Sequence, residues 1–267
     1  MTITIKHPVA PPAVVPYRYG IFSVAQPRTA ALEGLGVDEH WRLGVTWDSE
    51  ACGDALITFN QCIEPETGPL VTDRVCRLLE YPAFTVYAYN TDAIPGKTLA
   101  EHEANAVARL LNGEQRAVEE SVWAQLLVAD PVPTDMTAFP GWLGLGYIEQ
   151  AIAETFGSEG VIHMSRYAAS ALSLHLHVEG GVMRTVLGTP VVVGGGYDPL
   201  PSPIDSTATI YGTGPLVMFR GDVDTRENAI DKALNDVSIV AQRDYVLGWD
   251  CFAVGATIEL GCPSTEP

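Results

Sequence analysis

The chain has 267 residues, 47% of them apolar, which is enough to bury one substantial core with room for two lobes. Its formal charge of -18, from 15 basic and 33 acidic side chains, argues against a protein that wraps nucleic acid. No apolar run reaches the roughly 18 residues of a membrane span, and no basic segment precedes an apolar one at the N-terminus. We therefore expect neither a membrane protein nor an exported one.

Residues 1–40 are predicted to form an extended arm. Prolines recur between Pro8 and Pro27, and the first acidic residue is Glu33. Because proline fixes φ and lacks a backbone donor, this stretch should be extended rather than helical. Composition alone fits a loose terminus equally well. The isoleucines, valines and tyrosines of residues 1–40, however, make this stretch more apolar than a typical disordered tail. We favour an arm that lies along neighbouring subunits.

Residues 41–93 have the composition of strands. Residues 43–47 and 84–89 are rich in β-branched and aromatic side chains, and the stretch between them contains glycine and proline. This pattern predicts a long two-stranded excursion with an irregular tip. A hairpin of that length is marginal alone, so it needs a surface to rest on, which a neighbour in an assembly can provide.

The strongest local signal is a helix over residues 98–128. Thr98 and Glu101 have the spacing of a capping box, and an Asp-Pro pair follows the end of the helix. Six apolar residues at three- and four-residue spacing form a single stripe: Val107, Leu110, Leu111, Val118, Val122 and Leu126. Gly113 interrupts the helix near its middle, where it should bend or weaken it.

The remainder predicts a compact lobe of mixed helix and strand, so the expected fold class is α+β. A helix over 143–156 has the buried face Leu145, Ile148, Ile152 and Phe156. The strands expected after it are 161–164, 182–186, 190–193, 207–211 and 215–219, followed by a strand-rich segment at 237–260.

The most enzyme-like string is His175-Leu176-His177-Val178-Glu179. On a strand, His175, His177 and Glu179 share one face and could meet a metal ion. The cupin motif has similar residues, but its glutamate lies several residues further on. We favour the alternative that these are polar side chains at the end of a helix beginning at Ser165.

Other candidate motifs have structural explanations. Gly194-Gly195-Gly196 follows a strand, but neither phosphate-loop pattern is present and prolines follow where a helix is required, so we predict a turn. Residues 157–160 lack the spacing of a nucleophile elbow and read as a helix stop. His163 lies in an apolar run and is predicted to be a hydrogen-bonded core residue. No acidic pair stands out for catalysis, so no catalytic, cofactor or metal residue is assigned.

The five cysteines form no CxxC pair, which argues against a zinc ribbon or a redox motif. Their odd number fits the reducing cytoplasm. A disulfide among Cys52, Cys62 and Cys76 is left open.

The order of small elements in the second half carries a resemblance. A short helix closed by Gly157 and the strand 161–164 precede the segments 187–197, 210–215 and 241–250. This series resembles the C-terminal two thirds of tailed-phage major capsid proteins of the Hong Kong 97 type, especially those of phages infecting actinobacteria. That fold is shared with encapsulin shells.

The resemblance implies a division of the chain into five parts. They are an N-terminal arm (1–40), an extended loop (41–93), a peripheral domain with a long spine helix (94–140), an axial domain (141–218) and a return to the peripheral domain (219–267). Some capsids of this type crosslink through a lysine on the extended loop. This chain has Lys6, Lys97 and Lys232 and none between residues 41 and 92, so we predict no isopeptide crosslink.

The function implied is structural rather than enzymatic. The resemblance implies a coat protein that self-assembles into hexamers and pentamers of an icosahedral phage head, assembled in the host cytoplasm and found in the virion. It would enclose double-stranded DNA without sequence-specific binding and without a cofactor. The partners implied are further copies of itself and portal, scaffolding and decoration proteins. The alternatives are an encapsulin-type compartment, a minor or vertex coat protein and, in a different class, a metal-dependent enzyme using His175, His177 and Glu179.

Overall fold

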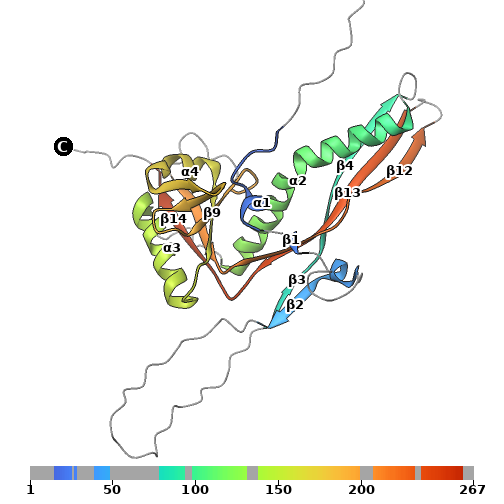
Figure 1. Cartoon of the computed structure of the whole chain (residues 1–267). Coiled ribbons are helices and arrows are strands. Elements are labelled where there is room, and N and C mark those ends of the chain that lie inside the picture. The colour runs from blue at the N-terminus through green and yellow to red at the C-terminus, as the bar shows by residue number, and fades with distance from the viewer. Residues whose placement is uncertain are drawn as a thin grey trace, which may run out of the picture.

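The computed structural model describes residues 15–25, 27–28, 39–48, 78–93, 98–130, 138–198, 207–231 and 236–260. Within these residues the chain is a mixed α+β protein whose strands form three sheets, as expected for the fold class. Figure 1 shows an elongated lobe, in which a long helix lies along a strand ribbon, joined to a more compact lobe of strands and shorter helices. No helix of the described part is both long and apolar enough to span a bilayer.

The long helix α2 (Leu99–Ala129) confirms the prediction for residues 98–128. Its capping box is formed, since Thr98 Oγ1 accepts from Glu101 N at 3.3 Å and Glu101 Oε2 accepts from Thr98 N at 2.6 Å. The predicted stripe is largely buried, although Leu111 remains 41% exposed at its edge. Figure 1 shows α2 bending part-way along its length.

The elongated lobe is built on the longest strand, β13 (Asp236–Trp249). One edge of β13 pairs antiparallel with β4 (Phe84–Ala93), and the other pairs first with β12 (Asp224–Asp231) and then with β11 (Leu216–Arg220). The short β1 (Pro27–Arg28) adds a parallel strand beside β11. Strand β12 was not predicted from the sequence.

Helix α2 covers one face of this first sheet, contacting both β4 and β13. Side chains alternate along the strands, so Val86 and Ile239 are buried beneath α2 while Tyr87 and Tyr89 on the other face are 67% and 60% exposed.

The expected two-stranded excursion has a different pairing from the one that composition suggested. After the short helical turn Glu39–Leu43, β2 (Val45–Asp48) pairs with β3 (Leu78–Tyr81). The segment 84–89 instead belongs to β4 in the first sheet. Residues 49–77, which include the predicted tip, lie outside the described residues. The base of the hairpin is packed on the body through Tyr81, whose hydroxyl donates to Trp249 O at 2.6 Å.

The compact lobe contains a seven-stranded sheet in the order β5-β14-β10-β6-β9-β8-β7. Its strands are β5 (Phe139–Pro140), β6 (Val161–Ser165), β7 (Leu176–Glu179), β8 (Val182–Thr185), β9 (Pro190–Gly194), β10 (Thr207–Thr213) and β14 (Ala253–Glu259). Its helices are α3 (Gly141–Thr155) and α4 (Arg166–Ala171). The predicted strands at 161–164, 182–186, 190–193 and 207–211 are therefore confirmed within a residue or two. Strand β14 comes from the last segment of the chain and pairs along the whole of β10.

This second sheet has a separate core on each face. On one side, α3 buries Leu145, Ile148 and Ile152 against β10 and β14, as predicted. The fourth residue of the predicted face, Phe156, follows the end of α3 and is only half-buried. On the other side, Tyr211 and Val192 join the core that surrounds α2. The C-terminal half of α2 is therefore packed against the second sheet, while its N-terminal half lies on the first.

The described cysteine, Cys251, lies in the turn between β13 and β14 and is disulfide-bonded. Cys52, Cys62 and Cys76 are outside the described residues, so a disulfide among them stays untested.

Gly113 gives a prediction about the stability of α2. A Cβ built at Gly113 meets no atom within 4 Å, so Gly113→Ala should raise the free energy of unfolding by about 1 kcal/mol through helix propensity. Gly144 of α3 provides the control, because a Cβ there would lie 2.3 Å from Ile258 Cγ2 and Gly144→Ala should destabilise the subunit. Urea unfolding of both variants measures the two effects, and equal shifts would contradict the prediction.

Candidate functional site

The most elaborate polar site of the described residues surrounds Glu119, a side chain of α2 that is 0% exposed. Its Oε1 accepts from Ile21 N at 3.1 Å and from Gln115 Nε2 at 3.2 Å. Its Oε2 accepts from Gly195 N at 2.7 Å, from Gly196 N at 3.0 Å and from the Tyr17 hydroxyl. Because every partner is a donor, the site is built for a carboxylate acceptor. We call Glu119, Gln115 and the turn Gly194–Gly196 the cradle.

The glycines of the cradle are required by close packing. A Cβ on Gly196 would lie 2.3 Å from Arg116 O of α2, and one on Gly195 would lie 2.9 Å from the Tyr17 ring. The turn predicted at 194–196 is thus confirmed. Its backbone amides bind an anion, as such turns commonly do, but the anion is the protein's own carboxylate.

The described part of the N-terminal arm is docked in the cradle. Tyr19 O accepts from Val193 N of β9 at 2.7 Å, which places the arm beside the edge of that strand. Arg166 of α4 donates to Arg18 O at 3.2 Å, and its guanidinium lies 5.1 Å from the Tyr17 ring centre. The short helix α1 (Ile21–Val24) then brings Ile21 into the core. Residues 15–25 therefore lie on their own subunit, and residues 1–14 lie outside the described residues.

Burial sets the protonation of this site. Burial raises the pKa of Glu119, although hydrogen bonds from Tyr17 and from the backbone amides of Gly196, Ile21 and Gly195 lower it. Burial and the neighbouring Glu119 raise the pKa of Tyr17 as well. The phenol of Tyr17 therefore stays protonated and donates a hydrogen bond to Glu119.

A second buried carboxylate, Glu114, fastens the same helix to the first sheet. It accepts from Arg243 at 2.7 Å and from the Tyr245 hydroxyl at 2.8 Å, both on β13, and it pairs with Arg220 of β11. Glu114 and Glu119 together connect α2 to both sheets.

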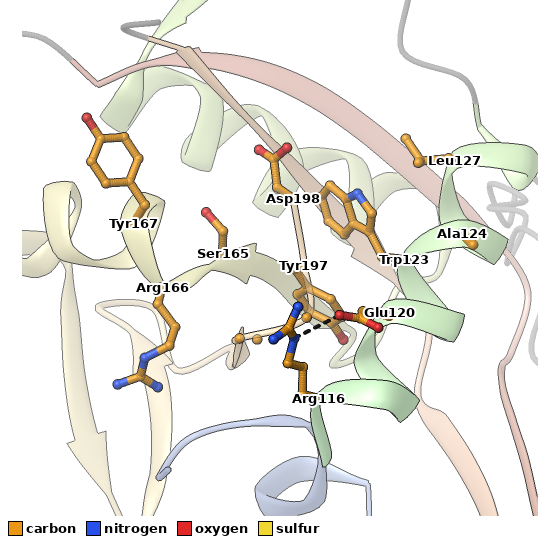
Figure 2. Close-up of a pocket in the computed structure, with 13 residues that line it drawn as sticks. Arg116, Glu120, Trp123, Ala124, Leu127, Ser165, Arg166, Tyr167, Tyr197 and Asp198 are labelled. Atoms are coloured by element: carbon orange, nitrogen blue, oxygen red, sulfur yellow. Dashed lines mark hydrogen bonds and ion pairs between the residues drawn. The ribbon is translucent and has the colours of Figure 1, made fainter. Parts of the chain in front are cut away.

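A cavity of about 580 Å³ lies beside the cradle, between α2, α4 and the turn after β9. Figure 2 shows Trp123 and Leu127 of α2 on one side and Tyr167 of α4 on the other, with Arg116 paired to Glu120 at the rim. Ser165 Oγ accepts from Ala168 N as the N-cap of α4, so it is occupied structurally. The lining residues present no nucleophile held by a base.

His163 is a packed core residue, as predicted. It is 0% exposed, and Thr213 Oγ1 lies 3.0 Å from its Nε2. Because the Thr213 hydroxyl donates to Gly214 O, it accepts from Nε2–H, which leaves Nδ1 to accept from the Tyr197 hydroxyl at 2.9 Å. The imidazole is thus neutral with both nitrogens satisfied, and burial lowers the pKa of His163 to about 3.

The candidate metal residues lie on the edge of the second sheet. His175 ends a short helical turn, whereas His177 and Glu179 are on strand β7, so our expectation that they end a helix was wrong. The chain leaves α4 at Leu172 and pairs with β8 instead. Glu179 Oε2 forms an ion pair with Arg184 of β8, whose Nε lies 3.4 Å away. Across the described residues, no three His, Cys, Asp or Glu side chains gather closely enough to hold a metal ion.

The sequence matches no protein-family model and no curated protein. Among solved structures, the capsid of a native GTA particle is similar with a TM-score of 0.57 at 12% identity, over 97% of this chain and 96% of that chain. A structure of Mycobacterium phage Che8 is similar with a TM-score of 0.56 at 8% identity, over 95% and 96%. The holo-SrpI encapsulin of Synechococcus elongatus PCC 7942 has a TM-score of 0.50 at 12% identity, over 72% and 79%.

The chain has the Hong Kong 97 fold. The likeness to the GTA capsid and to the Che8 structure covers 97% and 95% of this chain, so it concerns the fold of nearly the whole chain. The resemblance inferred from the order of elements in the second half is thereby confirmed.

Glu114 and Glu119 were not predicted from the sequence to be functional or structural sites. The signal was present, because Glu119 lies three residues before Val122 and one after Val118, inside the apolar stripe of α2. An acidic residue at a buried helical position requires donors from elsewhere in the chain.

Glu119→Gln should lower the free energy of unfolding by about 2 kcal/mol, because an amide places a donor against amides that already donate. Glu120→Gln is the matched control. Glu120 is 51% exposed in its pair with Arg116, so its loss should change stability by less than about 0.5 kcal/mol. Urea unfolding measures both variants, and equal effects would show that the cradle adds nothing specific.

His163 predicts a pH dependence of stability. The folded pKa is depressed to about 3 from an unfolded value near 6.5, so the unfolded state binds more protons and stability falls as pH drops between these values. In His163→Gln, the slope of unfolding free energy against pH from about 4 to 5.5 should fall by about 1 kcal/mol per pH unit. An unchanged slope in His163→Gln would contradict this prediction.

Proposed function

We propose that this protein is a structural coat subunit that self-assembles into a closed shell. The observation that carries the proposal is the likeness of almost the whole chain, 97% and 95% of it, to a GTA capsid and to a phage structure. Those similarities establish the fold, and the assembly itself is our inference.

The exposed surface supports contacts with further copies. Trp142 and Tyr147 of α3 are 59% and 42% exposed, and Leu187 beyond β8 is 76% exposed. On the first sheet, Tyr87 and Tyr89 form an uncovered face with threonine and serine neighbours. Aromatic side chains are enriched at protein interfaces, and large exposed patches mark interaction sites.

We extend the proposal to the parts of the subunit, using the division that the resemblance implied. In this proposal α2 is the spine helix of the peripheral domain, and the second sheet with α3 and α4 is the axial domain around five- and six-fold axes. The β2–β3 ribbon is the base of the extended loop. Strand β14 joins the second sheet, so the segment 219–267 contributes to both domains.

A phage head is favoured over an encapsulin compartment, because the phage and GTA capsid structures match a larger share of this chain. The capsid similarities span 95% or more of this chain, whereas the encapsulin similarity spans 72%. The proposed head consists of hexamers and pentamers around double-stranded DNA, in a virion assembled in the host cytoplasm. Portal, scaffolding and decoration proteins are the proposed partners, and a minor or vertex coat protein is a variant of the same proposal. Particles from the native source that hold protein cargo instead of DNA would favour the encapsulin.

The enzyme alternative has little support from geometry. His177 and Glu179 share a strand, but Glu179 is already near Arg184. We therefore propose no catalytic role for His175, His177 or Glu179. A stoichiometric transition metal that is lost in His177→Ala would reverse this conclusion.

Assembly is tested by electron microscopy and light scattering of the purified chain, with a scaffolding protein coexpressed if the chain alone stays monomeric. We expect closed shells or five- and six-membered rings. Monomers under both conditions would contradict the proposal.

Trp142→Ser should reduce the yield of shells without changing the fold, since Trp142 is 59% exposed. Gln150→Ser, at another exposed position of α3, should assemble normally.

A further inference from the structure

The arm segment Tyr17–Ile21 is held like a bound peptide. Its side chains and backbone meet groups from three other elements, and each contact is made at a different position of the segment. The Tyr17 hydroxyl and Ile21 N donate to the two oxygens of Glu119, while Tyr19 O accepts from β9. The contacts of Tyr19 O and Ile21 N are backbone contacts, so sequence selectivity at these positions comes from the Tyr17 hydroxyl and from the steric fit of the segment.

Gly20 is the position with the strictest steric requirement in the segment. A Cβ there would lie 1.7 Å from Gln115 Nε2 and 2.5 Å from Glu119 Oε1. Gln115 could move as a flexible side chain, but Glu119 is fixed by its other donors. The segment thus presents the pattern tyrosine-x-x-glycine-aliphatic.

Much of the framework of the cradle comes from elements other than the arm. Glu119 is on a helix of 31 residues, and the glycine amides that bind it follow a central strand. Trp123 of α2 stacks on Tyr197 at 5.2 Å, which holds the turn against the helix independently of Tyr17. With the arm displaced, a preformed carboxylate site would remain open beside β9.

We propose that the cradle is a peptide-recognition site that binds the tyrosine-x-x-glycine-aliphatic segment in trans as well as in cis. Its ligand is the segment 15–25 of this chain, including that of a second copy. The main-chain bond to β9 supplies part of the affinity, and the Glu119 contacts supply the selectivity. This inference concerns one subunit and holds whether or not shells form.

The test uses the full chain with Gly20→Val, which expels its own segment but keeps the cradle. Faster trypsin cleavage after Arg18 should report the expelled arm, and circular dichroism should show a retained fold. A fluorescently labelled peptide of residues 15–25 should then bind this variant at least about tenfold more tightly than it binds the wild-type chain, whose cradle is filled. Fluorescence anisotropy on monomeric protein gives both affinities.

Two controls identify the contacts. Adding Glu119→Gln to the Gly20→Val chain should weaken peptide binding by about tenfold or more, because hydrogen bonds to a charged acceptor are lost. A peptide that itself carries Gly20→Val should not bind. If the Gly20→Val chain fails to fold, Tyr17→Ala provides a second way to release the arm.

Equal binding to the wild-type and Gly20→Val chains, or equal binding with and without Glu119→Gln, would overturn the proposal. So would an unchanged rate of cleavage after Arg18 in Gly20→Val, because the glycine would then not be required. None of these results depends on assembly, so a failure of the shell proposal and a failure of this one are separate observations.

Discussion

A buried carboxylate needs donors, and this requirement organises the junction at Glu119. An ionised side chain in the interior is unfavourable unless its oxygens are fully hydrogen-bonded. Glu119 satisfies the requirement with groups from the N-terminal arm, from α2 itself and from the turn after β9. Because these groups are far apart in the chain, they meet only in one arrangement. The carboxylate therefore specifies how three parts of the molecule come together.

The same helix serves both lobes. Glu114, about one turn before Glu119, binds two arginines and a tyrosine of the first sheet. Around Trp123, the helix packs by aromatic contacts against Tyr211 of the second sheet and against Tyr197, just after β9. Apolar packing supplies cohesion on both sides, and the two carboxylates supply orientation. A subunit with this construction can keep its shape while its outer surfaces contact other molecules.

Those outer surfaces carry side chains that a solitary protein would usually bury. Tyrosines on the free face of the first sheet and Trp142 at the start of α3 are exposed, although the chain as a whole is strongly acidic. In the proposed shell, contacts between like-charged copies would come mainly from apolar and hydrogen-bonding groups, because net repulsion opposes association. The exposed aromatics are consistent with that requirement.

Elements whose signals are local could be predicted from the amino-acid sequence. The capping box and apolar stripe of α2, the buried strand β6 and the turn at Gly194–Gly196 depend on residues within a few positions of each other, so their patterns predicted them. The buried state of His163 followed from its apolar neighbours in the same way.

The meeting of groups distant in the chain could not be predicted from local patterns. Composition marked residues 84–89 as a strand, but the choice of β13 as its partner depends on burial beneath α2. His177 and Glu179 were assigned to a helix end, yet pairing with β8 made them a strand. Glu119 acquired its role because the arm and the glycine turn converge on it. Long-range pairing is selected by the free energy of the whole packed arrangement, which no short window of sequence contains.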